Sequence, residues 1–202
     1  MDQPLFPASE VTGIVLAGGK SSRFGTNKAL HPYKGKRLVE YAIGTLAPLC
    51  GRVLLSAGNG EDFAFTCLET VKDVYADCGP LGGIHACLNA SATAHNLVVG
   101  CDLPRLDTRL LAFLLQQSPG WQVVIPAHQG FRETMVGYYH RNCLSDLELA
   151  LLRGEYRILD AIRPLNVLFP EVSGQDFYAE KLFANINHPR DLPAGENGDE
   201  NR

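Results

Sequence analysis

Short apolar runs alternate along the chain with segments in which apolar residues recur every three or four positions. The apolar runs are five to seven residues long and cover residues 11–17, 52–57, 70–75, 96–101, 122–126 and 134–140. Their length and their flanking glycine, proline and aspartate residues predict buried β-strands. The segments with the longer period predict helices at residues 36–49, 84–89, 107–117 and 143–152.

Strands and helices that alternate in this way form βα units around a mostly parallel sheet. We therefore expect an α/β fold, a Rossmann-like three-layer αβα sandwich. The chain has 202 residues and no internal repeat or linker that would divide it, so a single domain over residues 1–193 is expected. Residues 194–202 (AGENGDENR) are polar and contain glycine, which predicts a disordered tail.

Composition and charge exclude several classes of protein. With 46% hydrophobic and 20% charged residues the chain should fold, and its net charge of −4 argues against nucleic acid as a partner. No segment approaches the ~20 apolar residues of a membrane-spanning helix, and residues 1–10 do not have the pattern of a targeting peptide. The six cysteines form no CxxC pair and no zinc spacing, so free thiols and a cytoplasmic location are expected.

The loop after the first predicted strand, with the sequence LAGGKSSRFGTNK, carries the strongest chemical signal. Gly18 and Gly19 allow the backbone to approach a phosphate group and to present N–H groups to it. Lys20, Arg23 and Lys28 add three positive charges. In an α/β fold this position is where ligands bind, although an ordinary basic surface loop is the alternative.

Two common phosphate-binding motifs do not fit this loop. A GxxxxGK[ST] motif would need glycine at Ile14, and a GxGxxG motif that starts at Gly18 would need glycine at Lys20. The loop is therefore neither an ATPase P-loop nor a standard dinucleotide fingerprint.

Asp102 is the leading candidate for a metal ligand. It lies in the sequence VVGCDLP, at the end of the predicted strand at residues 96–101, where this class of sheet builds its site. Mg²⁺ is commonly held by one or two protein carboxylates together with substrate phosphates. The alternative is that Asp102 caps the following helix, but Asp107 is better placed for that role.

A second candidate acid, Asp73, lies in the sequence VKDVYADCGP near the end of another predicted strand, with Asp77 as a competitor. An exposed loop acid is the alternative for both. The sequence GPLGG at residues 79–83 follows, and it fits either close approach of the backbone to a ligand or a tight turn between a strand and a helix that begins near Ile84.

These motifs together resemble one family. LAGGKSSRFGTNK, VKD, GPLGG, CDLP and NINHP (residues 185–189) occur in the order found in the MobA family of molybdenum cofactor guanylyltransferases. The resemblance covers about residues 11–192, and it implies a fold like that of the nucleotide-diphospho-sugar transferases. The first motif alone is typical of the wider nucleotidyltransferase superfamily. The motifs GPLGG, CDLP and NINHP narrow the resemblance to the MobA family.

The resemblance implies that a phosphate monoester of molybdenum-molybdopterin attacks the α-phosphorus of GTP, so that GMP is transferred and pyrophosphate leaves. Such a transfer depends on positioning and charge neutralisation rather than on a protein nucleophile. The attacking phosphate is already ionised near neutral pH, so no general base is needed. GTP and the pterin are then the substrates, Mg²⁺ the metal, and other enzymes of cofactor synthesis or acceptor enzymes are candidate partners.

The resemblance also implies roles for individual residues. Three groups are expected to carry the chemistry, and Asp102 among them is the Mg²⁺ ligand: Arg23, Lys28 and Asp102. The residues expected to contact the nucleotide, its phosphates or the metal are Leu16, Ala17, Gly18, Gly19, Lys28, Asp73, Asp102, Asn185 and Asn187. We expect Arg23, Lys28 and Mg²⁺ to share the charge that develops on the leaving pyrophosphate.

The chain departs from the family pattern at two places. Asn27 stands where many relatives have aspartate, and we expect it to change the rigidity of the loop rather than the chemistry. Residues 132–134 (RET) stand where relatives often have a His-Pro pair, in the region expected to bind the pterin. The alternatives are therefore a related nucleotidyltransferase that uses CTP or a sugar-phosphate acceptor, or a nucleotide-binding protein without catalysis.

Overall fold

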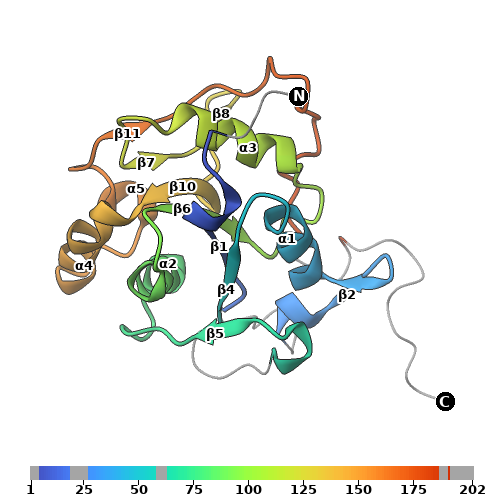
Figure 1. Ribbon diagram of the computed structural model, residues 1–202, viewed down its shortest axis with the longest axis horizontal. Coiled ribbons are helices and arrows are strands. Elements are labelled where there is room, and N and C mark those ends of the chain that lie inside the picture. Colours follow the sequence, from blue (N-terminus) through green and yellow to red (C-terminus); the bar gives the residue numbers. More distant parts are fainter. Residues whose placement is uncertain (1–4, 19–26, 58–62, 187–190, 192–202) are drawn as a thin grey trace.

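The computed structural model describes residues 5–18, 27–57, 63–186 and 191, and its centre is a seven-stranded sheet (Figure 1). The strand order is β11-β7-β10-β6-β1-β4-β5. The strands are β1 Val11–Leu16, β4 Arg52–Ser56, β5 Glu69–Val71, β6 His95–Gly100, β7 Val123–Val124, β10 Val136–His140 and β11 Val167–Leu168. Strand β10 pairs antiparallel with both neighbours, and all other pairs are parallel. The predicted mostly parallel sheet is confirmed.

Helices cover both faces of this sheet (Figure 1). On one face lie α1 Leu38–Leu46 and α3 Thr108–Gln117, and on the other lie α2 Gly79–Ala90, α4 Leu144–Leu152 and α5 Ile158–Ala161. Strand β1 separates two cores because alternate side chains point to opposite faces: Val11 and Val15 pack in the first, Ile14 and Leu16 in the second. The three-layer αβα sandwich is confirmed.

Two small hairpins project from this framework. They pair β2 Pro32–Tyr33 with β3 Lys36–Arg37, and β8 Ala127–His128 with β9 Phe131–Arg132. In each hairpin the two turn residues have positive φ, and the second is glycine, as a tight type I′ turn requires. Short 3-10 helices occupy Ala8–Glu10, Lys28–Leu30, Ala64–Thr66 and Arg141–Cys143.

The predicted boundaries are wrong at two helices and one strand. Helix α2 begins at Gly79 rather than near Ile84, because Pro80 lies in the first turn, where a residue without an N–H is tolerated. Helix α1 begins at Leu38 because residues 36–37 pair with β2. Strand β5 ends at Val71 rather than at residue 75.

Two other expectations are confirmed, and two stay predictions. Asp107 caps α3 as predicted, since its Oδ1 accepts a hydrogen bond from Arg109 N at 2.8 Å. The six cysteines are free thiols, as expected. Within the described residues, no helix is long and apolar enough to cross a membrane. The tail at residues 194–202 lies outside the described residues, and the single domain ending at residue 193 stays a prediction.

Candidate active site

The carboxyl ends of β5, β4, β1 and β6 lie side by side and carry the predicted site. Backbone hydrogen bonds continue past the strands: Ala17 N donates to Ser56 O at 2.9 Å, and Cys101 N donates to Leu16 O at 3.2 Å. The loops after these strands therefore leave the sheet together, at the edge where open α/β sheets bind ligands.

Leu16, Ala17 and Gly18 lie in the middle of this edge. The side chains of Leu16 and Ala17 are buried, and Leu16 packs into the core beneath α2. Gly18 is the first exposed residue after β1, so the surface available to a ligand at this strand begins with its backbone.

Lys28 and Asp102 meet at this edge although 74 positions separate them in the sequence. Lys28 Nζ lies 3.1 Å from Asp102 Oδ2, and both side chains are less than one-fifth exposed. The other oxygen, Asp102 Oδ1, is buried and has no hydrogen-bond partner in the described part of the chain. A buried carboxylate oxygen without a partner is unfavourable, so this atom fits a site completed by a ligand.

Gly100 leaves the space that the Asp102 carboxylate occupies. A Cβ atom at Gly100 would lie 2.8 Å from Asp102 Oδ1 and 3.0 Å from the methyl carbon of Met135. Because real Cβ contacts are longer, glycine is needed here for the carboxylate to keep its position. The sequence offered no separate signal for this role.

Asn27 fixes the short 3-10 helix that begins with Lys28. Its Oδ1 accepts a hydrogen bond from Ala29 N at 2.8 Å, and its Nδ2 donates to Ala17 O at 3.5 Å. The side chain is buried and so ties the base of the Lys28 segment to the end of β1. An aspartate could make the first hydrogen bond but not the second.

Asp73 lies after β5, at the other end of the row of strands. Its Oδ1 is buried and has no partner among the described residues. Burial raises the pKa of this carboxyl above its usual value, and a hydrogen bond with Ser56 opposes that shift. Asp77, the competing acid, is exposed and has a positive φ of 60°, so the structure favours Asp73 as the functional acid.

The GPLGG segment brings α2 directly against the end of β4. A Cβ atom at Gly83 would lie 2.3 Å from Ser56 Oγ, and one at Gly82 would lie 3.2 Å from Tyr75 O. Gly83 therefore permits a close approach of α2 to the end of β4, and Gly82 permits one to the loop after β5. Because residues 79–83 lie inside α2, they do not form a separate turn before the helix.

The C-terminal segment reaches the same edge. Ile186 N donates a hydrogen bond to Asp102 O at 3.0 Å, and the Ile186 side chain packs against Tyr33 and Leu38. Asn185 is exposed beside this contact, close to the chain at Asp102. Four further residues of the two loops, Gly19, Lys20, Arg23 and Asn187, lie outside the described residues, and their roles stay predictions.

Comparison with known proteins agrees with this geometry. The model of the MobA-like NTP transferase domain family matches residues 13–166. The chain belongs to this family. The family resemblance seen in the sequence motifs is thereby confirmed, and so is the class of nucleotidyltransferase.

Relatives of the MobA-like chain match it over nearly their whole length. A probable molybdenum cofactor guanylyltransferase of Pelotomaculum thermopropionicum is 33% identical over 91% of this chain and 90% of its own. The molybdenum cofactor guanylyltransferase of Vibrio parahaemolyticus is 30% identical over 91% of this chain and 94% of its own.

Solved structures show the same fold. Molybdopterin-guanine dinucleotide biosynthesis protein A from Archaeoglobus fulgidus superposes with a TM-score of 0.75 at 27% identity, over 90% of this chain and 94% of its own. A 2-C-methyl-D-erythritol 4-phosphate cytidylyltransferase from Thermus thermophilus superposes with a TM-score of 0.66 over 89% of this chain and 94% of its own, and at 15% identity it shows the fold alone.

In this MobA-like chain, the RET departure forms part of the β8–β9 hairpin. The Arg132 guanidinium lies over the Phe169 ring at 4.1 Å. Glu133 Oε1 lies 2.9 Å from His128 Nε2, and the His128 ring stacks on Phe183 with 4.6 Å between ring centroids. Arg132 therefore joins the hairpin to Phe169, and Glu133 supports His128, which stacks on Phe183.

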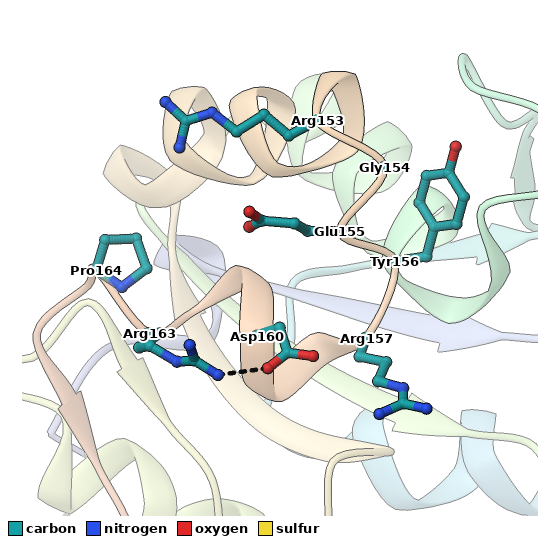
Figure 2. A pocket seen from close by; sticks show the side chains of 8 residues that line it. All are labelled: Arg153, Gly154, Glu155, Tyr156, Arg157, Asp160, Arg163 and Pro164. Atoms are coloured by element: carbon teal, nitrogen blue, oxygen red, sulfur yellow. Dashed lines mark hydrogen bonds and ion pairs between the residues drawn. The ribbon is translucent and has the colours of Figure 1, made fainter.

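A groove of about 770 Å³ in the α4–α5 region contains none of the predicted site residues (Figure 2). It is lined by residues 153–157, Asp160, Arg163 and Pro164. Arg163 pairs with Asp160 at 2.6 Å, and Figure 2 shows this pair facing the groove. No motif in the sequence predicts this groove, although the closely spaced arginines at 153, 157 and 163 are a visible cluster of positive charge.

Proposed function

We propose that the chain is a molybdenum cofactor guanylyltransferase that transfers GMP from GTP to the phosphate of molybdenum-molybdopterin and releases pyrophosphate. The observation that carries this proposal is the Lys28–Asp102 pair at the carboxyl edge of the sheet, with Asp102 Oδ1 buried and unpartnered in the described part of the chain. The relatives are named molybdenum cofactor guanylyltransferases, and these names suggest the pterin cofactor as the acceptor and a guanine nucleotide as the donor.

The described residues fit a magnesium ion bound partly by substrate. They contain no group of three or more histidine, cysteine or acidic side chains that could enclose a metal. A single carboxylate with a free oxygen, as at Asp102, is the donor set expected when phosphates supply the remaining ligands. Mg²⁺ bound there would neutralise charge on the reacting phosphates.

The protein groups then position and neutralise the triphosphate. The backbone at Gly18 and Gly19 presents N–H groups to the phosphates, and Arg23 and Lys28 supply positive charge. Lys28 already lies beside Asp102, so the triphosphate meets an ammonium group that is held in place rather than one that must be ordered on binding. Asn185 lies next to Ile186, whose N–H bonds to Asp102 O, and we expect Asn185 and Asn187 to contact the metal or the phosphates.

The acceptor phosphate attacks the α-phosphorus while pyrophosphate leaves on the opposite side. The acceptor itself needs no deprotonation, because a phosphate monoester is mostly ionised near neutral pH. The chain therefore has to bind two anions in line and to shield their charges, and the cations at Arg23 and Lys28 suit that task. A cytoplasmic location and contacts with other enzymes of cofactor synthesis remain predictions.

Pyrophosphate release tests this proposal. Each of the four ribonucleoside triphosphates is supplied with Mg²⁺, with or without molybdenum-molybdopterin, and a sugar phosphate replaces the pterin in a parallel series. Release that requires both GTP and the pterin is the expected result. Release with CTP, release with the sugar phosphate, or GTP binding without turnover would contradict the proposal.

A further inference from the structure

The outer face of α4 and the segment after it expose more apolar surface than the rest of the described chain. Helix α4 lies at the edge of the molecule (Figure 1), and Leu147, Ala150 and Leu151 on its inner face pack into the core. Eight large hydrophobic side chains are exposed in the described part of the chain, and four of them lie within residues 149–159. These four are Leu149, Leu152, Tyr156 and Leu159. Exposed apolar residues that cluster in this way indicate a surface that another molecule covers.

Leu149 and Leu152 form a stripe on α4 together with Ser145. The spacings of four and three residues put these side chains on one face of the helix. The two leucines are 49% and 65% exposed. Leucines at such spacings form the seam between helices that pack side by side. None of the three residues belongs to the proposed active site, so the stripe is free to contact a second helix while the site does its chemistry.

Two charged side chains flank this stripe on the same side. Asp146 lies in the first turn of α4, and Arg153 is the C-cap residue, two helical turns or about 10 Å further along. Neither side chain forms a salt bridge or a hydrogen bond within the described residues. The face therefore carries an acid near one end and a base at the other, with leucines between them.

We propose that α4 is the contact surface of a homodimer, in which the α4 helices of two copies pack antiparallel around a two-fold axis at the leucine stripe. Leu149 of each copy then faces Leu152 of the other. Asp146 of each copy lies beside Arg153 of the other, at heights along the helix that differ by about 3 Å. The face thus complements itself in apolar contacts and in charge, which a two-fold contact requires because the same surface is used twice.

The size of the face predicts a weak dimer. A standard interface uses about 20–30 residues from each side, whereas residues 145–159 form a shorter segment of which part is buried in the core. The net charge of −4 on each copy also opposes association. We expect a dissociation constant of about 10–100 µM, so the dimer should form only in concentrated solutions.

Sedimentation velocity of the wild-type chain from about 1 to 300 µM measures this association. Reducing conditions are needed because Cys67 is exposed. The double variant Leu149→Ala/Leu152→Ala should weaken association at least about 10-fold, because it removes the apolar centre of the contact. The control is Leu5→Ala, at a leucine outside α4 that is also 49% exposed, and it should leave association unchanged. Thermal unfolding shows that each variant is folded.

An exchange of charges tests the antiparallel arrangement. Asp146→Arg puts two positive groups at each charged contact of its own dimer, and Arg153→Asp puts two negative groups there. Each variant alone should therefore associate about 3- to 10-fold more weakly than the wild type. In an equimolar mixture, both contacts of the mixed dimer join opposite charges, so the mixed dimer should regain the affinity of the wild type.

Three outcomes would overturn the proposal. A wild-type chain that stays monomeric at the highest concentration does not form this contact. Association that survives the loss of both leucines uses another surface. A mixture of the two charge variants that associates no more tightly than each variant alone would exclude the antiparallel arrangement. Since none of these readouts requires GTP or turnover, they leave the proposed function untouched.

Discussion

The carboxyl edge of the sheet, where Asp73, Lys28 and Asp102 lie and where GTP, the GMP donor, is proposed to bind, is here called the donor edge. Its polar groups and those of the β8–β9 hairpin differ in how far they are hydrogen-bonded. At the donor edge, Asp73 and Asp102 each keep one buried oxygen without a partner in the described part of the chain. In the hairpin, His128 bonds to Glu133, its other ring nitrogen lies 3.4 Å from the Tyr178 hydroxyl, and Arg132 covers Phe169. Among the described residues, the donor edge thus keeps two carboxylate oxygens without a hydrogen bond, whereas the hairpin is largely satisfied by its own contacts.

This difference separates function from stability. A buried polar atom without a partner lowers stability, so it persists where a ligand supplies the missing interaction. A satisfied cluster contributes to stability and holds a surface in shape. Changes at the donor edge should therefore alter activity more than folding, and changes in the hairpin should do the reverse.

The largest effect is expected at Asp102. Asp102→Asn keeps the shape of the side chain but removes the charge that a divalent metal requires, so turnover should fall by about 10³-fold or more. Thermal unfolding should change little, because the asparagine oxygen can still accept the hydrogen bond from Lys28 Nζ. Asp107→Asn is the matched control, since asparagine caps a helix as well as aspartate does. A rate for Asp102→Asn near that of the control would remove Asp102 from the reaction.

A smaller effect is expected at Gly100. In Gly100→Ala the new methyl group meets Asp102 Oδ1, so the carboxylate must move. Activity should fall about 10- to 100-fold, with a loss of about 1–3 kcal/mol in the free energy of unfolding.

The control for this change is Gly44→Ala in α1, where a Cβ would have no heavy atom within 4 Å. It should leave activity intact and stabilise the helix by about 0.5–1 kcal/mol. Steady-state kinetics and denaturant unfolding measure the activity and the free energy of unfolding of both alanine variants. Equal activity of the two alanine variants would show that the position of Asp102 is not set by Gly100.

In the hairpin, Glu133→Gln should weaken the bond to His128 and lower the free energy of unfolding by about 0.5–1.5 kcal/mol. If the hairpin binds the pterin, KM for the pterin should rise several-fold while GTP affinity stays unchanged. Glu180→Gln, at an exposed position, is the control. A loss of GTP affinity in Glu133→Gln would contradict the claim that the donor edge binds GTP independently of the hairpin.

Local features of the fold and the site could be predicted from the sequence, whereas contacts between distant segments could not. The sequence distinguishes Asp102 as a site residue from Asp107 as a helix cap, because Asp102 directly follows one strand and Asp107 directly precedes one helix. Both are local features. The Lys28–Asp102 pair and the contact of Ile186 with Asp102 join distant segments, so only the folded chain reveals them. The start of α2 was missed because Gly-Pro suggests a turn by itself, while packing on Ser56 continues the helix through it. The strands of the β8–β9 hairpin have two residues each, too few for a periodic pattern.

The smallest predicted effect concerns the pH dependence of stability. Burial raises the pKa of Asp73 in the folded chain, so the folded state binds the proton more tightly than the unfolded state does. Stability should therefore fall as pH rises from the unfolded pKa through the folded pKa, and the loss is complete above it. Asp73→Asn should remove this loss and raise the Tm of the nucleotide-free chain near neutral pH by at most about 4 °C. A Tm that falls at neutral pH would mean that the carboxylate stabilises the fold.

The transfer of label from GTP to the pterin tests the central claim most directly. GTP labelled at the α-phosphorus or at the γ-phosphorus is incubated with the chain, Mg²⁺ and molybdenum-molybdopterin, and the products are separated. The account predicts that the α-label appears in a pterin dinucleotide and the γ-label in pyrophosphate, and that Asp102→Asn forms neither product. Transfer of the γ-label to the pterin, or release of the α-label as free GMP alone, would contradict it.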